Sequence, residues 1–185
     1  MNQRHNKKIN SSVLRFIGFI ILLSSISSCT YDQNQQITVG FSPGHSACNL
    51  IINIISQAHQ TIDIAAYSFT SKPISLALLE AQKHGVKIRI LADYKANFNN
   101  YTAITYLANH RMSVRLNKHY AIMHNKFMII DSQIIETGSY NYTSAADKHN
   151  AENIIILYHS PEIASQYTKE FNRLWEESLV IPSRY

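Results

Sequence analysis

Apolar residues follow two alternating patterns along the chain from residue 37 onwards. Short continuous apolar runs are typical of buried strands, whereas apolar residues three and four positions apart are typical of helices. The segment from Leu50 to Ala58 has the helical spacing, and the run from Ile62 to Tyr67 is continuous. The expected strands cover residues 37–41, 62–67, 86–92, 113–116, 126–130, 134–138 and 154–158, and the expected helices cover 45–59, 71–84, 101–109 and 160–175.

Polar and turn-forming residues support several of these boundaries. Ser71 with Pro73 resembles a helix start, and Gly85 is suited to the position just after a helix. Ser160 followed by Pro161 predicts the cap and first residue of the last helix. Helices that alternate with apolar strands predict an α/β fold whose mixed, mostly parallel sheet is sandwiched between helices. The sheet is expected to be mixed because two late strands form a hairpin-like pair.

The first 28 residues have the order of a signal peptide. A basic start precedes the apolar run Phe16–Leu23, which is followed by the small polar stretch Ser24–Cys29. The run is too short to span a bilayer, which takes about 20 apolar residues. We therefore expect residues 1–28 to direct export across the inner membrane. Residues 29–36 are expected to form a polar tether, and residues 37–180 a single domain.

Cys29 is a candidate lipidation site, because Ile26-Ser27-Ser28-Cys29 resembles a bacterial lipobox. The same stretch also fits an ordinary cut after Ser27 or Ser28. If Cys29 is acylated, Cys48 is expected to be a buried apolar thiol. Otherwise a disulfide between the two cysteines could form in an oxidising compartment. Secretion and lipid anchoring both remain open.

The formal net charge of +5 belongs mostly to the leader. Without residues 1–28 the chain has 13 basic and 12 acidic residues, a net charge of +1. The body therefore gives no general electrostatic argument for a nucleic-acid partner.

The tripeptide His-Asn-Lys occurs twice, and only the second copy has a chemical setting. His5 lies in the leader without a nearby carboxylate, and we expect it to have no catalytic role. The second copy begins HNKFMIIDSQIIETGSYNYT at His124. On a strand, His124 and Lys126 would point to the same face. Ser139 and Asn141 follow Gly138, which permits close backbone approach.

These groups suit a phosphate site, since ammonium, hydroxyl and amide groups bind phosphate oxygens and histidine can attack phosphorus or shuttle a proton. A structural histidine beside a solvated lysine is the alternative. A metal site is disfavoured, because Lys126 repels a cation and no second ligand has suitable spacing.

The stretch resembles the signature of the phospholipase D superfamily, H-x-K-x4-D-x6-G-S-x-N, at every specified position. Residues 64–70 resemble the early strand of that family, and residues 150–153 its downstream acidic segment. From about Thr38 to Glu177 the chain is similar to compact members with one motif per chain, which include small exported rickettsial phospholipases and small bacterial endonucleases.

The resemblance implies a role for each matching residue. His124 would be the nucleophile and form a phosphohistidine intermediate. Lys126, Ser139 and Asn141 would bind the phosphoryl oxygens, and Glu152 would orient a histidine by a hydrogen bond. No metal or other cofactor is expected. Asp131 completes the catalytic signature with His124 and Lys126, although it is expected to be a structural hydrogen-bond acceptor beside the site rather than an acid.

The family mechanism uses two histidines, so a chain with one motif is expected to work as a homodimer. The expected function is an exported phosphodiesterase that hydrolyses phosphatidylcholine to phosphatidate and choline at a membrane surface. The alternative substrate is nucleic acid, cut by a metal-independent, nonspecific endonuclease, for which Lys118 and Lys126 could supply a basic patch. A non-catalytic surface lipoprotein is disfavoured by the complete set of site residues.

Overall fold

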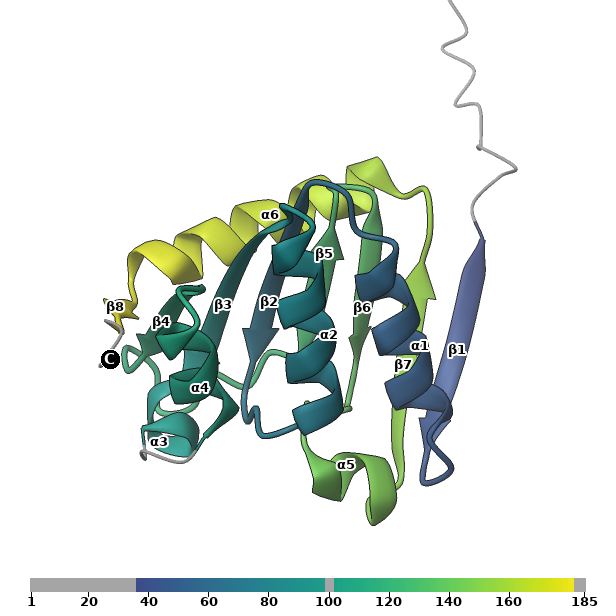
Figure 1. Ribbon diagram of the computed structural model, residues 1–185, viewed down its shortest axis with the longest axis horizontal. Helices are drawn as coiled ribbons and strands as arrows, with labels where there is room; N and C mark the ends of the chain where they lie inside the picture. Colours follow the sequence, from purple (N-terminus) through teal and green to yellow (C-terminus); the bar gives the residue numbers. More distant parts are fainter. Residues whose placement is uncertain (1–35, 99–101, 182–185) are drawn as a thin grey trace, which may run out of the picture. The chain divides into compact units, whose positions relative to one another are not determined.

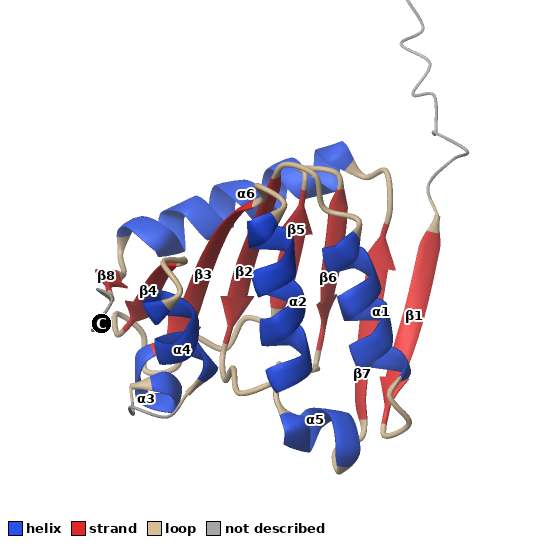
Figure 2. Cartoon of the chain, viewed as in Figure 1, coloured by secondary structure: helices blue, strands red, loops and turns tan. Residues whose placement is uncertain are grey.

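The computed structural model describes residues 36–98 and 102–181, which fold around one eight-stranded sheet (Figures 1 and 2). The strand order is β1-β7-β6-β5-β2-β3-β4-β8. The strands are β1 (Ile37–Ser42), β2 (Thr61–Ala66), β3 (Lys87–Asp93), β4 (Ser113–Asn117), β5 (Phe127–Ile130), β6 (Ile134–Gly138), β7 (Glu152–Leu157) and β8 (Leu179–Val180). The helices are α1 (Ser46–Ser56), α2 (Lys72–Lys83), α3 (Tyr94–Asn97), α4 (Ala103–Asn109), α5 (Ser144–Lys148) and α6 (Pro161–Glu176).

The sheet is mixed, as predicted, but most of its neighbouring strands are antiparallel. Only β2–β3 and β3–β4 pair in parallel. Parallel neighbours need a crossover connection, which α2 and α4 supply for these two pairs. A short turn joins β5 to β6, so these strands run antiparallel, and β5 also pairs antiparallel with β2. The expectation of a mostly parallel sheet is therefore wrong.

Helices cover both faces of the sheet, as the sequence predicts. Figure 1 shows α1, α2 and α4 in front of the sheet, with α6 crossing behind it. The apolar stripe of α1 that the sequence indicated is buried, with Ile51, Ile54 and Ile55 fully covered. On the opposite face, α6 packs Phe171 and Leu174 against Leu91 and Phe127. Burial of these faces supplies the main driving force for folding.

The helix boundaries follow the local signals with one exception. The Ser71 side chain accepts a hydrogen bond from the backbone N–H of Ile74, and Gly85 has a φ of 89° just after α2. Pro161 is the first residue of α6, but the Ser160 hydroxyl donates to the carbonyl of Tyr158 instead of capping the helix. The short elements α3, α5 and β8 have too few residues to produce a periodic pattern.

Three expectations for the start of the chain fall on residues that the structure does not describe. They are the signal peptide over residues 1–28, lipidation of Cys29, and the tether over residues 29–36 except for its last residue. Cys48 is described, and it is a buried free thiol. Within residues 36–98 and 102–181, no helix is long and apolar enough to cross a bilayer.

Candidate active site

His124 and Lys126 lie in an extended segment that leads into β5, not in the strand itself. The segment is tied at both ends. The Met123 N–H donates to Asp93 Oδ2 (2.9 Å), and the completely apolar strand β5 is buried between β2 and β6. The Lys126 ammonium turns back to donate to the carbonyl oxygen of His124 (2.8 Å). The predicted juxtaposition of the two side chains therefore holds, although the segment has no ladder partners of its own.

Tyr67, which follows β2, packs against both of these side chains. Its ring centroid lies 4.7 Å from that of His124, and the Lys126 Nζ lies 5.3 Å from the same ring. His124 is exposed, whereas Lys126 is only 7% exposed. The phenol ring thus limits the orientations of the imidazole and provides a cation–π contact for the ammonium.

The Lys126 ammonium is the one buried lysine head group among the described residues. Burial lowers its pKa from the usual value, and the Glu152 carboxylate opposes this shift. A partly desolvated ammonium interacts more strongly with a phosphate oxygen than a solvated one does. The environment therefore suits Lys126 to charge stabilisation.

Ser139 and Glu152 form a second hydrogen-bonded group, and Glu152 is close enough to Lys126 to act on its charge. The Ser139 hydroxyl donates to Glu152 Oε2 (2.6 Å) and accepts from the Asn153 N–H (3.1 Å). Asn150 donates to the second carboxylate oxygen of Glu152 (2.9 Å). Ser139 and Glu152 are thus held by their neighbours before any substrate binds.

Gly138 brings β6 and β7 close enough for this network. A Cβ at this position would overlap the carbonyl oxygen of Asn153 and lie 2.9 Å from the Cα of Ile154. Only glycine permits such an approach without moving the backbone. The glycine of the signature is therefore explained by packing between strands.

Asn141 follows on the loop between β6 and α5. Its Oδ1 atom is buried and has no hydrogen-bond partner within the described residues. Most buried polar side-chain atoms in proteins do have such a partner. The amino group of the same amide can donate to a bound phosphate oxygen.

Asp131 lies at the opposite end of β5 from Lys126, so the structure does not bring it to the site. A strand of this length separates the two residues by about 16 Å. The Asp131 carboxylate accepts the backbone N–H groups of His59, Gln60 and Thr61, each at 2.8 Å. The expected role as hydrogen-bond acceptor is present, but its expected place beside the site is wrong.

Glu152 makes no hydrogen bond to a histidine among those of the described residues; its oxygens contact Ser139 and Asn150. Its expected role in orienting a histidine stays a prediction. Metal ligands do not cluster either, since residues 36–98 and 102–181 contain no group of three acidic, histidine or cysteine side chains suited to an ion.

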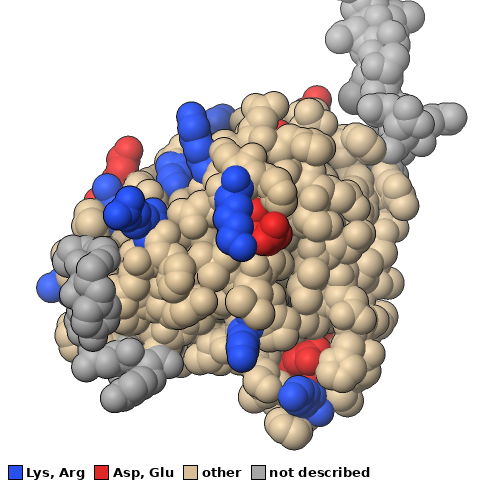
Figure 3. Space-filling view, in the orientation of Figure 1, with Lys and Arg blue, Asp and Glu red and all other residues tan. Residues whose placement is uncertain are grey.

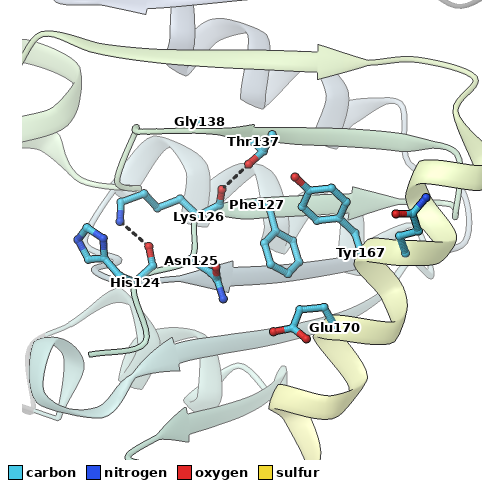
Figure 4. A pocket seen from close by; sticks show the side chains of 9 residues that line it. His124, Asn125, Lys126, Phe127, Thr137, Gly138, Tyr167 and Glu170 are labelled. Atoms are coloured by element: carbon cyan, nitrogen blue, oxygen red, sulfur yellow. Dashed lines mark hydrogen bonds between the residues drawn. The ribbon is translucent and has the colours of Figure 1, made fainter. Parts of the chain in front are cut away.

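A pocket of about 360 Å³ opens beside His124 and Lys126 and runs between β5, β6 and α6 (Figure 4). Figure 4 shows His124 and Lys126 at one end and Tyr167 and Glu170 of α6 at the other. The Thr137 hydroxyl on its floor donates to the Lys126 carbonyl (3.1 Å). The complete lining is His124, Asn125, Lys126, Phe127, Thr137, Gly138, Gln166, Tyr167 and Glu170.

Sequence reasoning missed the supporting residues of this site. Tyr67 was recognised only as part of a strand, and Tyr167 only as part of the apolar face of the last helix. Asn150 carried no signal except its place in the segment that resembles the family's acidic stretch. The contacts of Tyr67 and Tyr167 join residues far apart in the chain, so no local pattern predicts them, whereas Asn150 bonds to Glu152 only two positions away.

The arrangement combines an accessible imidazole with an ammonium, a hydroxyl, an amide and a carboxylate. A phosphodiester held by the donors would present phosphorus to the His124 ring, and the donors would stabilise charge that develops on its oxygens. The geometry therefore fits nucleophilic phosphoryl transfer.

Comparison with known proteins agrees with this chemistry. Residues 51–175 match the family model described as cardiolipin synthase, PLD-like domain. The chain is 36% identical over 137 residues to phospholipase D of Rickettsia conorii, covering 74% of this chain and 68% of that protein. It is 29% identical to the human mitochondrial cardiolipin hydrolase, covering 75% of this chain and 54% of that protein.

Solved structures show the same fold. Nuc of Salmonella typhimurium, a phospholipase D family member, superimposes with a TM-score of 0.78 at 33% identity, covering 80% of this chain and 99% of that one. NucT of Helicobacter pylori gives a TM-score of 0.73 at 28% identity, with the same coverage of both chains. With the family match and the signature of His124 and Lys126, these likenesses show that the chain belongs to the phospholipase D superfamily and is a phosphodiesterase.

Proposed function

We propose that the protein is an exported phospholipase that hydrolyses phosphatidylcholine to phosphatidate and choline, with two copies of the chain together forming one active site. The observation that carries the proposal is the grouping of His124 and Lys126 at one pocket, with Glu152, which is hydrogen-bonded to Ser139, close enough to act on the Lys126 charge. The rickettsial relatives that are named phospholipase D support a lipid substrate.

The reaction proceeds in two displacements. A nitrogen of His124 attacks phosphorus, and the bond from phosphorus to the choline oxygen breaks. The leaving oxygen takes a proton from the partner subunit's His124. Water then attacks the phosphohistidine and gives its proton to the same partner histidine, which releases phosphatidate and restores both imidazoles. Lys126 and Ser139 hold the phosphoryl oxygens throughout.

Apolar side chains near the site support a membrane substrate. Ile122, two residues before His124, is more than half exposed, and so is Phe98, at the end of α3. The segment that contains Ile122 is linked to α3 by a contact between Lys95 and the carbonyl of Ala121 (3.5 Å). Exposed apolar groups on the same rim as a phosphodiester site fit a lipid surface better than a polyanion.

The nearly balanced charge of the body also favours lipid over nucleic acid, since without residues 1–28 the chain has 13 basic and 12 acidic residues. On the face drawn in Figure 3, which is opposite α6, Lys and Arg side chains gather at the upper left and elsewhere stand singly or beside acidic ones, so they form no continuous band across that face. Nonspecific nucleic-acid binding depends on many phosphate contacts from such a band.

An exposed apolar strip supports association of two copies. Ile37, Val39 and Phe41 of the edge strand β1 are each more than half exposed. They face away from α1, because the intervening Gly40 is the residue that contacts this helix. β1 pairs with β7, which carries Glu152. Burial of the strip against a second copy would supply the missing histidine at an isologous contact.

The test is choline release from phosphatidylcholine vesicles in the presence of EDTA, with sedimentation to establish the dimer. His124→Ala should lower turnover by about 10³-fold or more, because no other group can form the covalent intermediate. Release by the variant at the wild-type rate would overturn the mechanism.

Nucleic acid is the second candidate substrate, because the signature reads only the phosphodiester and is shared with small endonucleases. Plasmid degradation without choline release would establish this alternative. Its rate should fall steeply with salt, whereas hydrolysis of zwitterionic vesicles should change little.

A further inference from the structure

The end of the pocket furthest from His124 is acidic and aromatic, which is unusual beside a phosphate site. Tyr167 and Glu170 project from α6 towards Phe127 of β5 (Figure 4). The rings of Phe127 and Tyr167 meet edge to face, with their centroids 4.9 Å apart. An aromatic ring and a carboxylate thus border the same cavity as Lys126.

Glu170 keeps its negative charge in this setting. Arg173 donates to both of its carboxylate oxygens, at 2.6 and 2.9 Å, and this hydrogen bonding lowers the pKa of Glu170. Arg173 also forms an ion pair with Glu177 (2.8 Å). The three side chains together carry a net charge of −1, so the carboxylates outnumber the guanidinium on this part of α6.

A polyanion would be disfavoured at this end of the pocket, whereas an organic cation would be favoured. The face of a tyrosine ring attracts a quaternary ammonium group through its quadrupole, and a nearby carboxylate adds to that attraction. A volume of about 360 Å³ lies in the range of small-ligand pockets. The polarity therefore reverses along the pocket, from cationic at Lys126 to anionic at Glu170.

We infer that Tyr167 and Glu170 form a subsite for the cationic head group of the substrate, placed beside the phosphate-binding residues. This assignment rests on the proposed function and deepens it, since it selects choline and other ammonium head groups over neutral or anionic ones. The zwitterion of such a lipid matches the reversal of charge: its phosphate lies at Lys126 and its ammonium at Tyr167.

Direct binding of choline tests the subsite without requiring turnover. Saturation-transfer NMR on the purified protein gives the affinity for choline and for neohexyl alcohol, the isostere in which carbon replaces the nitrogen. Choline should bind about ten-fold more tightly, because only the cation interacts with the ring face and the carboxylate. Tyr167→Leu and Glu170→Gln should each remove most of this preference.

Two further variants serve as controls. Tyr167→Phe keeps the ring and should keep the preference. Glu176→Gln removes a carboxylate from the exposed side of the same helix, outside the pocket, and should also keep it. Equal binding of choline and the alcohol to the wild-type protein would overturn the assignment, and so would a preference that survives both Tyr167→Leu and Glu170→Gln.

The outcome is separable from that of the proposed function. A choline preference that depends on Tyr167 and Glu170, without hydrolysis of phosphatidylcholine, would support the subsite and overturn the proposed substrate. Hydrolysis of phosphatidylcholine with no such preference would overturn the subsite alone.

Discussion

Two carboxylates on neighbouring strands show how the same group is put to different use in this fold. Glu136 of β6 accepts a hydrogen bond from the Tyr142 hydroxyl (2.7 Å), and Glu152 of β7 accepts one from the Ser139 hydroxyl (2.6 Å). Glu136 is fully buried among apolar residues, whereas Glu152 is only partly covered at the end of its strand.

The different roles of Glu136 and Glu152 follow from the different burial of their carboxyl groups. Desolvation raises the pKa of Glu136 to about 8, so this side chain is mainly neutral at pH 7. Glu152 stays accessible and close enough to Lys126 to oppose the lowering of that ammonium's pKa by burial. The interior of the sheet therefore holds a neutral structural acid, and its end holds a charged group that can act on a substrate or on an imidazole.

Loss of the negative charge of Glu152 is expected to have the largest effect on turnover. Glu152→Gln should lower turnover by about 10³-fold, or about 4 kcal/mol of activation free energy, because the amide cannot stabilise an imidazolium. The free energy of unfolding should change by less than about 1 kcal/mol, since the position is accessible and the glutamine oxygen can still accept from one of the two donors, Ser139 or Asn150. Steady-state kinetics and urea denaturation measure the two quantities.

A large loss of stability in Glu152→Gln would contradict this comparison, because it would make Glu152 a structural residue like Glu136. The matched variant Glu152→Asp keeps the charge but shortens the side chain, and it should retain more activity than the amide.

A third carboxylate, Asp131, extends the comparison to the other end of the hairpin. Asp131→Ala should lower the free energy of unfolding by about 3 kcal/mol, because three backbone N–H groups lose their acceptor. The residue also has a φ of 50°, which alanine adopts less readily than aspartate. Urea denaturation measures the loss, and Asp131→Asn, which keeps one acceptor oxygen and tolerates this φ, should lose less.

Activity separates this structural role from a catalytic one. If turnover per folded molecule of Asp131→Ala fell as far as that of Glu152→Gln, Asp131 would belong to the chemistry despite its distance from Lys126.

The contrast between these residues also explains what the sequence could predict. The spacing of His124, Lys126, Ser139 and Asn141 identified the site because the signature lies on one continuous hairpin, where a fixed number of residues determines the geometry. The start of α2 at Ser71 was predictable for the same reason, since its cap depends on neighbours only. Local information of this kind specifies elements and motifs.

Contacts between distant segments were not predictable in this way. The antiparallel pairing of β5 with β2 depends on register between segments about 65 residues apart, so the mostly parallel sheet was a wrong expectation. Glu136 lies between apolar residues and Thr137, which gives no sign that it is fully buried and paired with Tyr142. Asp131 has a fixed place in the signature, yet only the fold shows that β5 separates it from Lys126.

The smallest effect at neutral pH is expected from the buried acid. The folded-state pKa of Glu136 lies above its unfolded value, so its contribution to stability is complete below about pH 4.5 and is lost as the pH rises through about 8. Between these values the free energy of unfolding should fall with pH by up to about 1.4 kcal/mol per unit. Glu136→Gln should abolish this dependence, while changing stability near pH 6 by only about 1 kcal/mol, because the amide still accepts from Tyr142.

Urea denaturation at pH 6 and pH 9 measures the dependence, with Glu152→Gln as the control that removes an accessible carboxylate. Glu136→Gln should be more stable than the wild type at pH 9. The wild-type carboxyl must then either carry a buried charge or stay protonated at a pH above its pKa. A pH dependence that is unchanged in Glu136→Gln and lost in Glu152→Gln would exchange the roles assigned to the two side chains. The accessible carboxylate would then be the one that links protonation to folding.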